Sequence, residues 1–215
     1  MHLIIEFFHF LLHINQYLAL WINQYGTLTY GFIALILFCE TGLVIAPFLP
    51  GDSLLFAAGS LFAGSSLNVH LLVIFGIIAV FCGDNVNYAV GRYLGNPLFT
   101  QKSHFLKPKY LTKTHLFLER YGLYAIFLAR FVPIVRTYVP FACGMGYLRY
   151  QRFFIISLLA AVVWITLLIY LGYFFGRIAW VQKNFSVAIL LVVLISVMPG
   201  IISALTLWFK KAKHP

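Results

Sequence analysis

Two carboxylates and two arginines lie in stretches of the sequence that are otherwise apolar. Glu40 and Asp52 fall within FCETGLVIAPFLPGDSLLFAAG. Arg130 and Arg136 fall within FLARFVPIVRTYVPFACGMG. The planar guanidinium group of arginine grips a phosphate through parallel hydrogen bonds, and a carboxylate in an apolar setting can take up and release a proton. We therefore interpret the arginines as binding groups for a phosphate head group and the carboxylates as proton-coupling groups.

These charges can share one site only if they face one another. A charge isolated at membrane depth costs roughly 2.5–3.5 kcal/mol even on lenient insertion scales, whereas opposite charges in contact largely neutralise each other. Backbone donors at helix starts near Ser53 and Thr137 would support the same anion. Asp84, in a polar run within an apolar segment, must point inward and is a supporting candidate. We predict that the four charges meet in one pocket at the middle of the bilayer.

The elements that must position these residues are two helices that break inside the membrane. Pro47 and Pro50 interrupt the first apolar stretch, and proline removes a backbone donor and kinks a helix. Broken backbone at membrane depth is tolerated only where protein or a water-filled cavity satisfies its polar groups. We therefore predict re-entrant helical hairpins at residues 25–66 and 121–147, each entering and leaving on one side of the membrane.

The remaining segments are predicted as transmembrane and interfacial helices of an all-α polytopic membrane protein. A bilayer needs spans of about 20 apolar residues. Basic residues that alternate with apolar ones predict an amphipathic segment on the cytoplasmic surface. In chain order, the predicted elements are an N-terminal helix at 1–24, a transmembrane helix at 69–93, the amphipathic segment at 96–120 and transmembrane helices at 153–176 and 187–209. Asn23 to Gly26 predicts the turn after the first helix, which could cross the membrane or lie at its interface.

Composition supports one membrane domain. Hydrophobic residues make up 62% of the 215 residues and charged residues only 9%, which is typical of polytopic membrane proteins. The net charge of +10 does not indicate nucleic-acid binding, because all 15 Lys and Arg lie at or after Arg92, between apolar runs, as in cytoplasmic loops. We interpret Arg92 and Arg177 as anchors whose side chains extend to the lipid head groups.

No metal, cofactor or catalytic site is predicted. The cysteines are isolated in apolar runs without C-x-x-C spacing. His9 and His13 are spaced like metal ligands, but a third ligand is not evident. The sequence contains no Ser–His or Cys–His pattern that would indicate an enzyme.

The two halves of the chain repeat at an offset of 85 residues. Phe56–Gly59 returns as Phe141–Gly144, and Tyr88–Arg92 returns as Tyr173–Arg177. One span after each hairpin inverts the second copy, so the first hairpin would enter from outside and the second from the cytoplasm. Inverted repeats with paired broken helices are the architecture of many secondary transporters.

Each charged residue also has a purely structural interpretation. Asp52 could cap the second half-helix of its hairpin, and Arg136 could satisfy loop carbonyls. Glu40 and Arg130 could form a structural ion pair. Asp84 could bond to the asparagines beside it, or to nearby backbone, and serve packing alone.

The polar motifs together resemble one known family. The run from Glu40-Thr41-Gly42 to Asp52-Ser53, the Gly83-Asp84 span and the run from Arg130 to Gly144 are similar to the DedA family of bacterial inner-membrane proteins, within the SNARE-associated or VTT-domain superfamily. The resemblance extends over about residues 10–205. It implies two opposed re-entrant hairpins, proton-driven transport of lipid carriers such as undecaprenyl phosphate, acidic functional positions at Glu40 and Asp52, and functional arginines at Arg130 and Arg136.

The leading hypothesis is therefore a translocase for a polyprenyl lipid phosphate in the bacterial inner membrane, with the KKAKH tail in the cytoplasm. Its expected partner is an anionic lipid, undecaprenyl phosphate or a phospholipid, with no nucleic acid, and homo-oligomerisation is left open. Two alternatives keep the fold. One is a small-ion or drug/proton antiporter, and the other is a non-transporting scaffold or an uncoupled lipid scramblase.

Overall fold

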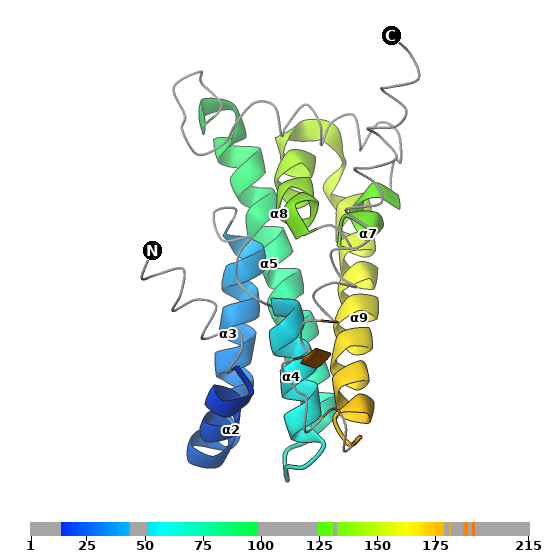
Figure 1. Ribbon diagram of the computed structural model, residues 1–215. Helices are drawn as coiled ribbons and strands as arrows, with labels where there is room; N and C mark the ends of the chain where they lie inside the picture. The colour runs from blue at the N-terminus through cyan, green and yellow to red at the C-terminus, as the bar shows by residue number, and fades with distance from the viewer. Residues whose placement is uncertain are drawn as a thin grey trace.

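A computed structural model describes residues 14–43, 51–98, 124–130 and 133–178, together with single positions at 181, 187, 188 and 191. Within these residues all regular structure is helical, which confirms the predicted all-α class. The helices are α2 (Ile14–Tyr25), α3 (Leu28–Gly42), α4 (Gly51–Phe62), α5 (Val69–Leu98), α7 (Tyr124–Ala129), α8 (Pro133–Ala142), the π-helical η1 (Cys143–Tyr147) and α9 (Tyr150–Phe175). Figure 1 shows that α5 and α9 run the full height of the bundle in opposite directions.

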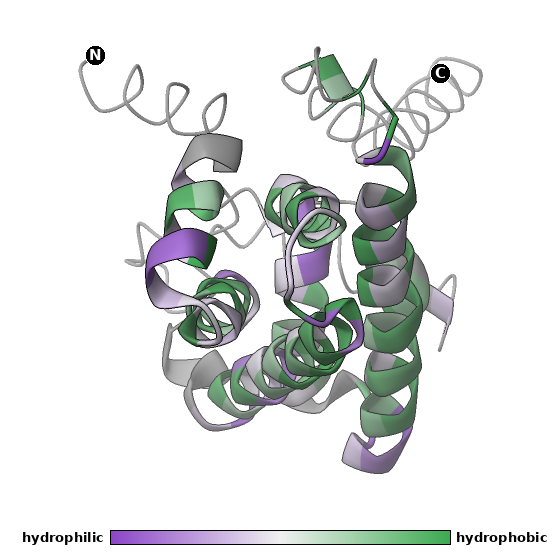
Figure 2. Ribbon diagram, turned by 90° about the horizontal axis from the view of Figure 1, so that it is seen from below, coloured by the Kyte–Doolittle hydropathy of each residue, from purple (hydrophilic) through white to green (hydrophobic). Residues whose placement is uncertain are grey.

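Helices α5 and α9 are the candidate membrane spans of the described chain. Val69–Tyr93 of α5 and Tyr150–Phe175 of α9 are long and apolar enough to cross a bilayer. Their outward side chains are not covered by protein, and Figure 2 shows hydrophobic residues over most of α9. The exposed apolar side chains include Leu71, Ile74, Phe75 and Ile78 on α5 and Ile155, Leu159, Val163 and Leu167 on α9. Hydrocarbon chains of lipid would cover such faces.

The ends of several predicted elements differ from the structure. Helix α2 continues to Tyr25, so the chain turns at Gly26, whose φ of 51° is a left-handed conformation that favours glycine. Helix α5 continues to Leu98, so its end includes residues 96–98 of the predicted amphipathic segment. The rest of that segment, residues 1–13 with His9 and His13, and most of the predicted span at 187–209 lie outside the described residues.

Helices α3 and α4 form a pair whose ends meet near the middle of the bundle. Helix α3 ends at Gly42, because Leu43 is extended (φ −93°, ψ 110°), and α4 begins at Gly51. The carboxylate of Glu40 lies against Gly51, in the space that a Cβ atom would fill. Glycine at position 51 therefore lets the start of α4 approach the last turn of α3. Residues 44–50, which include Pro47 and Pro50, lie outside the described residues.

Helices α7 and α8 form the second pair, and prolines and the π-helical turn η1 shape it. Pro133 is the first residue of α8, where its missing donor costs nothing. Pro140 lies inside α8 and cannot donate to the carbonyl group of Arg136, one turn earlier. The helix then widens into η1, and Leu148 is extended (φ −145°, ψ 143°) before α9 begins. In Figure 1 this pair occupies the upper half of the bundle and α4 the lower half.

The second helix of each pair packs against the long helix that follows the other pair. Helix α4 packs on α9, whereas α8 and η1 pack on α5; the first helices, α3 and α7, pack on α5 and α9 respectively. Glycines permit the close approach: Gly172 of α9 lies against the carbonyl group of Phe56, and Gly91 of α5 lies against that of Phe141. Phe56 and Phe141 are the residues that the offset of 85 pairs in sequence.

These glycine contacts lead to a test of the packing. Replacing Gly172 with alanine should destabilise the protein by about 1–3 kcal/mol, because the new methyl group would overlap the Phe56 carbonyl. Gly31→Ala is the matched control, because no atom lies within 4 Å of a Cβ atom at that exposed helical position. We expect the control to keep or slightly raise the apparent Tm in detergent. Equal Tm values for the two variants would show that the α4–α9 contact is not close.

Candidate functional site

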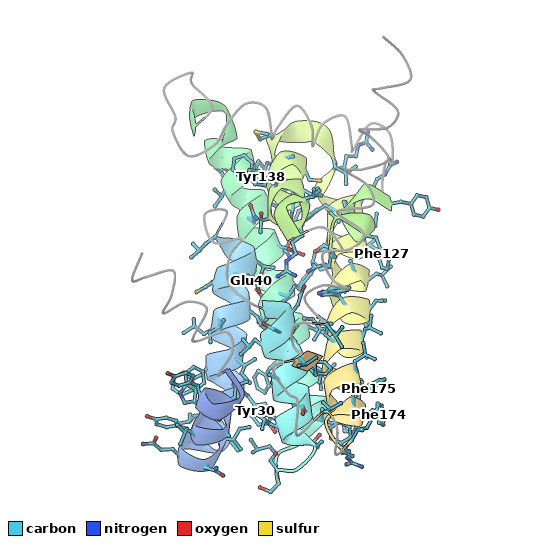
Figure 3. All side chains as sticks on the ribbon, in the orientation of Figure 1. Tyr30, Glu40, Phe127, Tyr138, Phe174 and Phe175 are labelled. Carbon is cyan, nitrogen blue, oxygen red and sulfur yellow. The ribbon has the colours of Figure 1, made fainter. Side chains whose placement is uncertain are left out.

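A cluster of buried charges lies where α3, α4 and α8 meet, and Figure 3 shows Glu40 near mid-height of the bundle. Arg136 of α8 donates from Nη2 to Oε1 of Glu40, in the last turn of α3. Its other terminal nitrogen, Nη1, donates to Oδ1 of Asp52, in the first turn of α4, at 2.8 Å. One guanidinium group thus bridges two carboxylates from the other half of the chain.

A second ion pair continues the cluster toward α9. Arg130, directly after α7, donates from Nη2 to Oδ2 of Asp84 on α5. Ser157 of α9 donates to the same carboxylate oxygen at 2.5 Å. All three residues are buried, with 6% of Arg130 and 4% of Asp84 exposed. An ion pair at this depth holds only when both partners are present, because each would otherwise be an uncompensated buried charge.

Helix α9 also contributes to the Asp52 side of the cluster. The indole nitrogen of Trp164 donates to Oδ1 of Asp52 at 3.0 Å. Asp52 lies within the first turn of α4, and the donors to its Oδ1 are the side chains of Arg136 and Trp164. Its role is therefore not limited to capping α4, which was one interpretation from sequence.

Asn87 of α5 connects the two helix pairs just beside the charges. Its amide nitrogen donates to the carbonyl of Thr41 at 3.1 Å and to that of Thr137 at 2.8 Å. Thr41 follows Glu40 in α3, and Thr137 follows Arg136 in α8. Asn87 is fully buried, and its Oδ1 has no hydrogen-bond partner among the described residues. This one amide fixes the backbone of both pairs to the same turn of α5.

Replacing Asn87 tests this connection. Asn87→Ala leaves two buried carbonyl groups without their donor, so we expect a loss of about 1–3 kcal/mol in stability. Asn85→Ala is the control on the same helix, because Asn85 is only half-buried and bonds to Phe81 and to the exposed hydroxyl of Tyr150. The measurement is the apparent Tm of both variants in the same detergent. A control that falls as far as Asn87→Ala would contradict the account.

The structure brings together most of the residues singled out from sequence, with one change of partner. Glu40, Asp52 and Arg136 form one group, but Arg130 pairs with Asp84 and not with Glu40. The interpretation of Glu40 and Arg130 as a mutual ion pair is therefore wrong. So is the interpretation of Asp84 as a partner of the neighbouring asparagines, because its carboxylate accepts from Arg130 and Ser157.

Ser53 and Thr137, the predicted sources of backbone donors, are both buried, at 1% exposure each. Sequence reasoning missed Trp164 and Ser157, which lie in an apolar run and gave no signal. It also ranked Asp84 below the other charges, although a count of acids and arginines at membrane depth would have included it.

Charge is not balanced within the cluster. Two guanidinium groups, from Arg130 and Arg136, face three carboxylates, so the fully ionised cluster carries one net negative charge. These are also the three carboxylates of the described chain. An excess of carboxylates over arginines leaves room for proton uptake, since a proton on one carboxyl would neutralise the group.

Two apolar spans around a buried ionic cluster define a helical membrane protein with an internal polar site. Residues 49–174 match the model of the VTT domain, and the chain belongs to the DedA family of VTT-domain proteins.

Three relatives illustrate the similarity. Protein DedA of Escherichia coli K12 is 47% identical over 205 residues, covering 94% of each chain. An uncharacterized membrane protein of Mycobacterium tuberculosis is 38% identical over 194 residues, covering 89% of this chain and 85% of the relative. The inner membrane protein YqjA of E. coli K12 is 33% identical over 207 residues, covering 90% and 94%. No solved structure matches the chain significantly.

Proposed function

We propose that this protein translocates a polyprenyl lipid phosphate, undecaprenyl phosphate being the expected species, across the bacterial inner membrane and that protons drive the movement. Arg136 and Arg130 bind the phosphate head group, Glu40 and Asp52 exchange protons, and the prenyl tail stays in lipid beside the bundle. The observation that carries the proposal is the guanidinium of Arg136, held between two carboxylates near mid-bundle. The lipid is moved without chemical change, so the protein is not an enzyme.

The geometry of Arg136 suits a phosphate. Its two terminal nitrogens donate to separate carboxylate oxygens, one on Glu40 and one on Asp52. Two oxygens of a single phosphate present the same acceptors to an arginine fork. A phosphate group can therefore replace both carboxylates at once without loss of hydrogen bonds to the guanidinium.

The net charge of the cluster supports coupling of phosphate binding to proton uptake. The ionised cluster already carries one excess negative charge, and a phosphate monoester adds about −1.5 to −2 near neutral pH. Without protonation, a displaced Glu40 or Asp52 would face the phosphate as a buried like charge. Binding of the lipid is thus coupled to proton uptake by these carboxyls, and its release is coupled to proton loss.

Alternating access follows from an inverted repeat of re-entrant hairpins, α3–α4 and α7–α8 with η1. The support is the reciprocal packing, in which α4 lies on α9 while α8 and η1 lie on α5. The charges fall at equivalent places, with Glu40 and Arg130 at the ends of first helices and Asp52 and Arg136 in the first turns of second helices. In the proposed topology, rocking of one hairpin exposes the cluster to one side at a time, and the C-terminus is cytoplasmic.

A second candidate function is proton-coupled antiport of a small cation or a cationic drug. The net negative charge of the ionised cluster favours it, because a cation could replace a proton at Glu40 or Asp52. This alternative requires no lipid movement, and it would leave the phosphate geometry of Arg136 without a use.

Reconstitution in liposomes tests the proposal. Purified protein with labelled undecaprenyl phosphate and an imposed pH gradient should move the label between leaflets faster than empty liposomes, and collapse of the gradient should slow it. Movement that ignores the gradient would instead indicate an uncoupled scramblase. Proton flux driven by a soluble cation, with no lipid movement, would indicate the antiporter and overturn the proposal.

A further inference from the structure

A pocket of about 580 Å³ opens at the end of the bundle where α9 begins, apart from the central cluster. Tyr88 and Arg92 of α5, Gly144 of η1, and Arg149, Tyr150 and Gln151 at the start of α9 line it. None of these residues takes part in the ion pairs around Arg130 and Arg136. The pocket is large enough to hold a phosphate group together with part of a glycerol or sugar head group.

The two arginines of this pocket have no carboxylate partner in the described part of the chain. Glu40, Asp52 and Asp84 are the carboxylates of that part, and each is bound to Arg130 or Arg136 in the central cluster. Arg92 and Arg149 are both exposed and line the same cavity. Two cations that share one cavity without a carboxylate repel each other until an anion enters.

The rest of the pocket wall adds donors suited to an anion. Helix α9 has 26 residues, and no side-chain hydrogen bond caps its start at Arg149. Its first residues, Tyr150 and Gln151, line the pocket, so the positive end of the helix dipole lies beside it. Gly144, in the π-helical turn, lies directly against the Tyr88 carbonyl, and this close contact shapes the wall opposite α9.

We propose that this pocket is a second, peripheral site that binds a phosphate group through Arg92 and Arg149. Its ligand is the phosphate of a membrane lipid head group or free inorganic phosphate, which present the same oxygens. In the proposed topology the pocket lies on the cytoplasmic side. If the proposed function holds, a lipid phosphate would bind in this pocket before it enters the central cluster or after it leaves.

Arg177 provides a comparison for the pocket arginines. It is the counterpart of Arg92 at the offset of 85, and it stacks on the ring of Tyr173 at 4.6 Å while donating to the Tyr173 hydroxyl at 2.7 Å. Arg92 has the equivalent hydrogen bond with Tyr88, so the two arginines differ in that Arg92 lines the pocket and Arg177 does not. Arg177→Gln is therefore the matched control for Arg92 and Arg149.

Photocrosslinking tests the proposal on the full chain in vesicles of phosphatidylcholine with photoactivatable phosphatidic acid. We expect crosslinks to the segment 145–151, and the double variant Arg92→Gln/Arg149→Gln should lower them by at least about tenfold, given roughly 1.5–3 kcal/mol for each charged hydrogen bond. Arg177→Gln should leave them unchanged. Arg92→Lys/Arg149→Lys, which keeps the charge but loses the forks, should give an intermediate yield.

Competition separates the two sources of phosphate. Inorganic phosphate that suppresses the crosslinks at 145–151 would identify a general phosphate site, and crosslinks that resist it but require the two arginines would identify a lipid head-group site. Equal crosslinking in the double variant and wild type, or none at 145–151, would overturn the inference. Lipid translocation by the wild-type protein is measured in parallel. Crosslinks at 145–151 without translocation would contradict the proposed function alone. Translocation without crosslinks at 145–151 would contradict the peripheral site alone.

Discussion

Arg136→Gln should abolish movement of lipid phosphate and at the same time destabilise the protein. The substitution removes the cation that Glu40 and Asp52 share, and loss of one partner of a buried ion pair costs about 3–5 kcal/mol. Transport in liposomes should fall to the level of empty vesicles. The apparent Tm in detergent should fall as well, unless the two carboxyls take up protons at low pH.

A charge-neutral variant separates the two effects of Arg136. Combining Arg136→Gln with Glu40→Gln and Asp52→Asn removes all three charges. At these positions, neutral amides then replace the carboxylates that would otherwise be buried without a cation. We expect the triple variant to regain most of the lost stability without regaining transport. Recovery of transport together with stability would mean that Arg136 serves structure alone, and the phosphate role would be wrong.

The second large effect is expected at Asp84. Asp84→Leu leaves Arg130 as a buried guanidinium without a counter-ion and also removes the acceptor for Ser157, so we expect a loss of about 3–5 kcal/mol in stability. Adding Arg130→Met to the same chain should restore much of that loss, because an apolar pair of similar volume is often tolerated at such positions. The measurement is the apparent Tm of both single variants and the double variant.

A comparison with Ser157→Ala shows how much of the effect of Asp84→Leu comes from the pairing of Asp84 with Arg130. Ser157→Ala removes only one neutral donor to the carboxylate and should cost about 1.5–3 kcal/mol. If Asp84→Leu cost no more than Ser157→Ala, Arg130 would have another anionic partner, and the pairing with Asp84 would not be its main support.

The sequence was enough to predict which charges lie inside the membrane domain. Glu40, Asp52, Arg130 and Arg136 each interrupt an apolar run, and burial of an unpaired charge is so costly that a meeting of opposite charges follows. Helices α5 and α9 were visible as apolar runs of bilayer length, and their bounds differ from the predicted ones by a few residues at the ends.

Partner choice within the cluster was not predictable, because it depends on how the helices pack. The contact of Arg130 with Asp84 requires α7 to lie against α9 with its end directed toward α5, which no local pattern indicates. Trp164 and Ser157 sit in an apolar helix where tryptophan and serine are ordinary residues. Only the packing of α9 against α4 and α5 brings their donors to Asp52 and Asp84. The offset of 85 did identify Phe56 and Phe141, which make equivalent backbone contacts.

The central claim is that a lipid phosphate takes the place of Glu40 and Asp52 on Arg136 and that the displaced carboxyls bind protons. The most direct test is the affinity for polyprenyl phosphate in detergent as a function of pH above 7, where the phosphate, with a second pKa near 6, stays doubly ionised. If one proton is taken up with each lipid, linkage makes the affinity rise by about tenfold for each unit that the pH falls. The double variant Glu40→Gln/Asp52→Asn should bind with little dependence on pH. An affinity that is independent of pH in the wild-type protein would contradict the account.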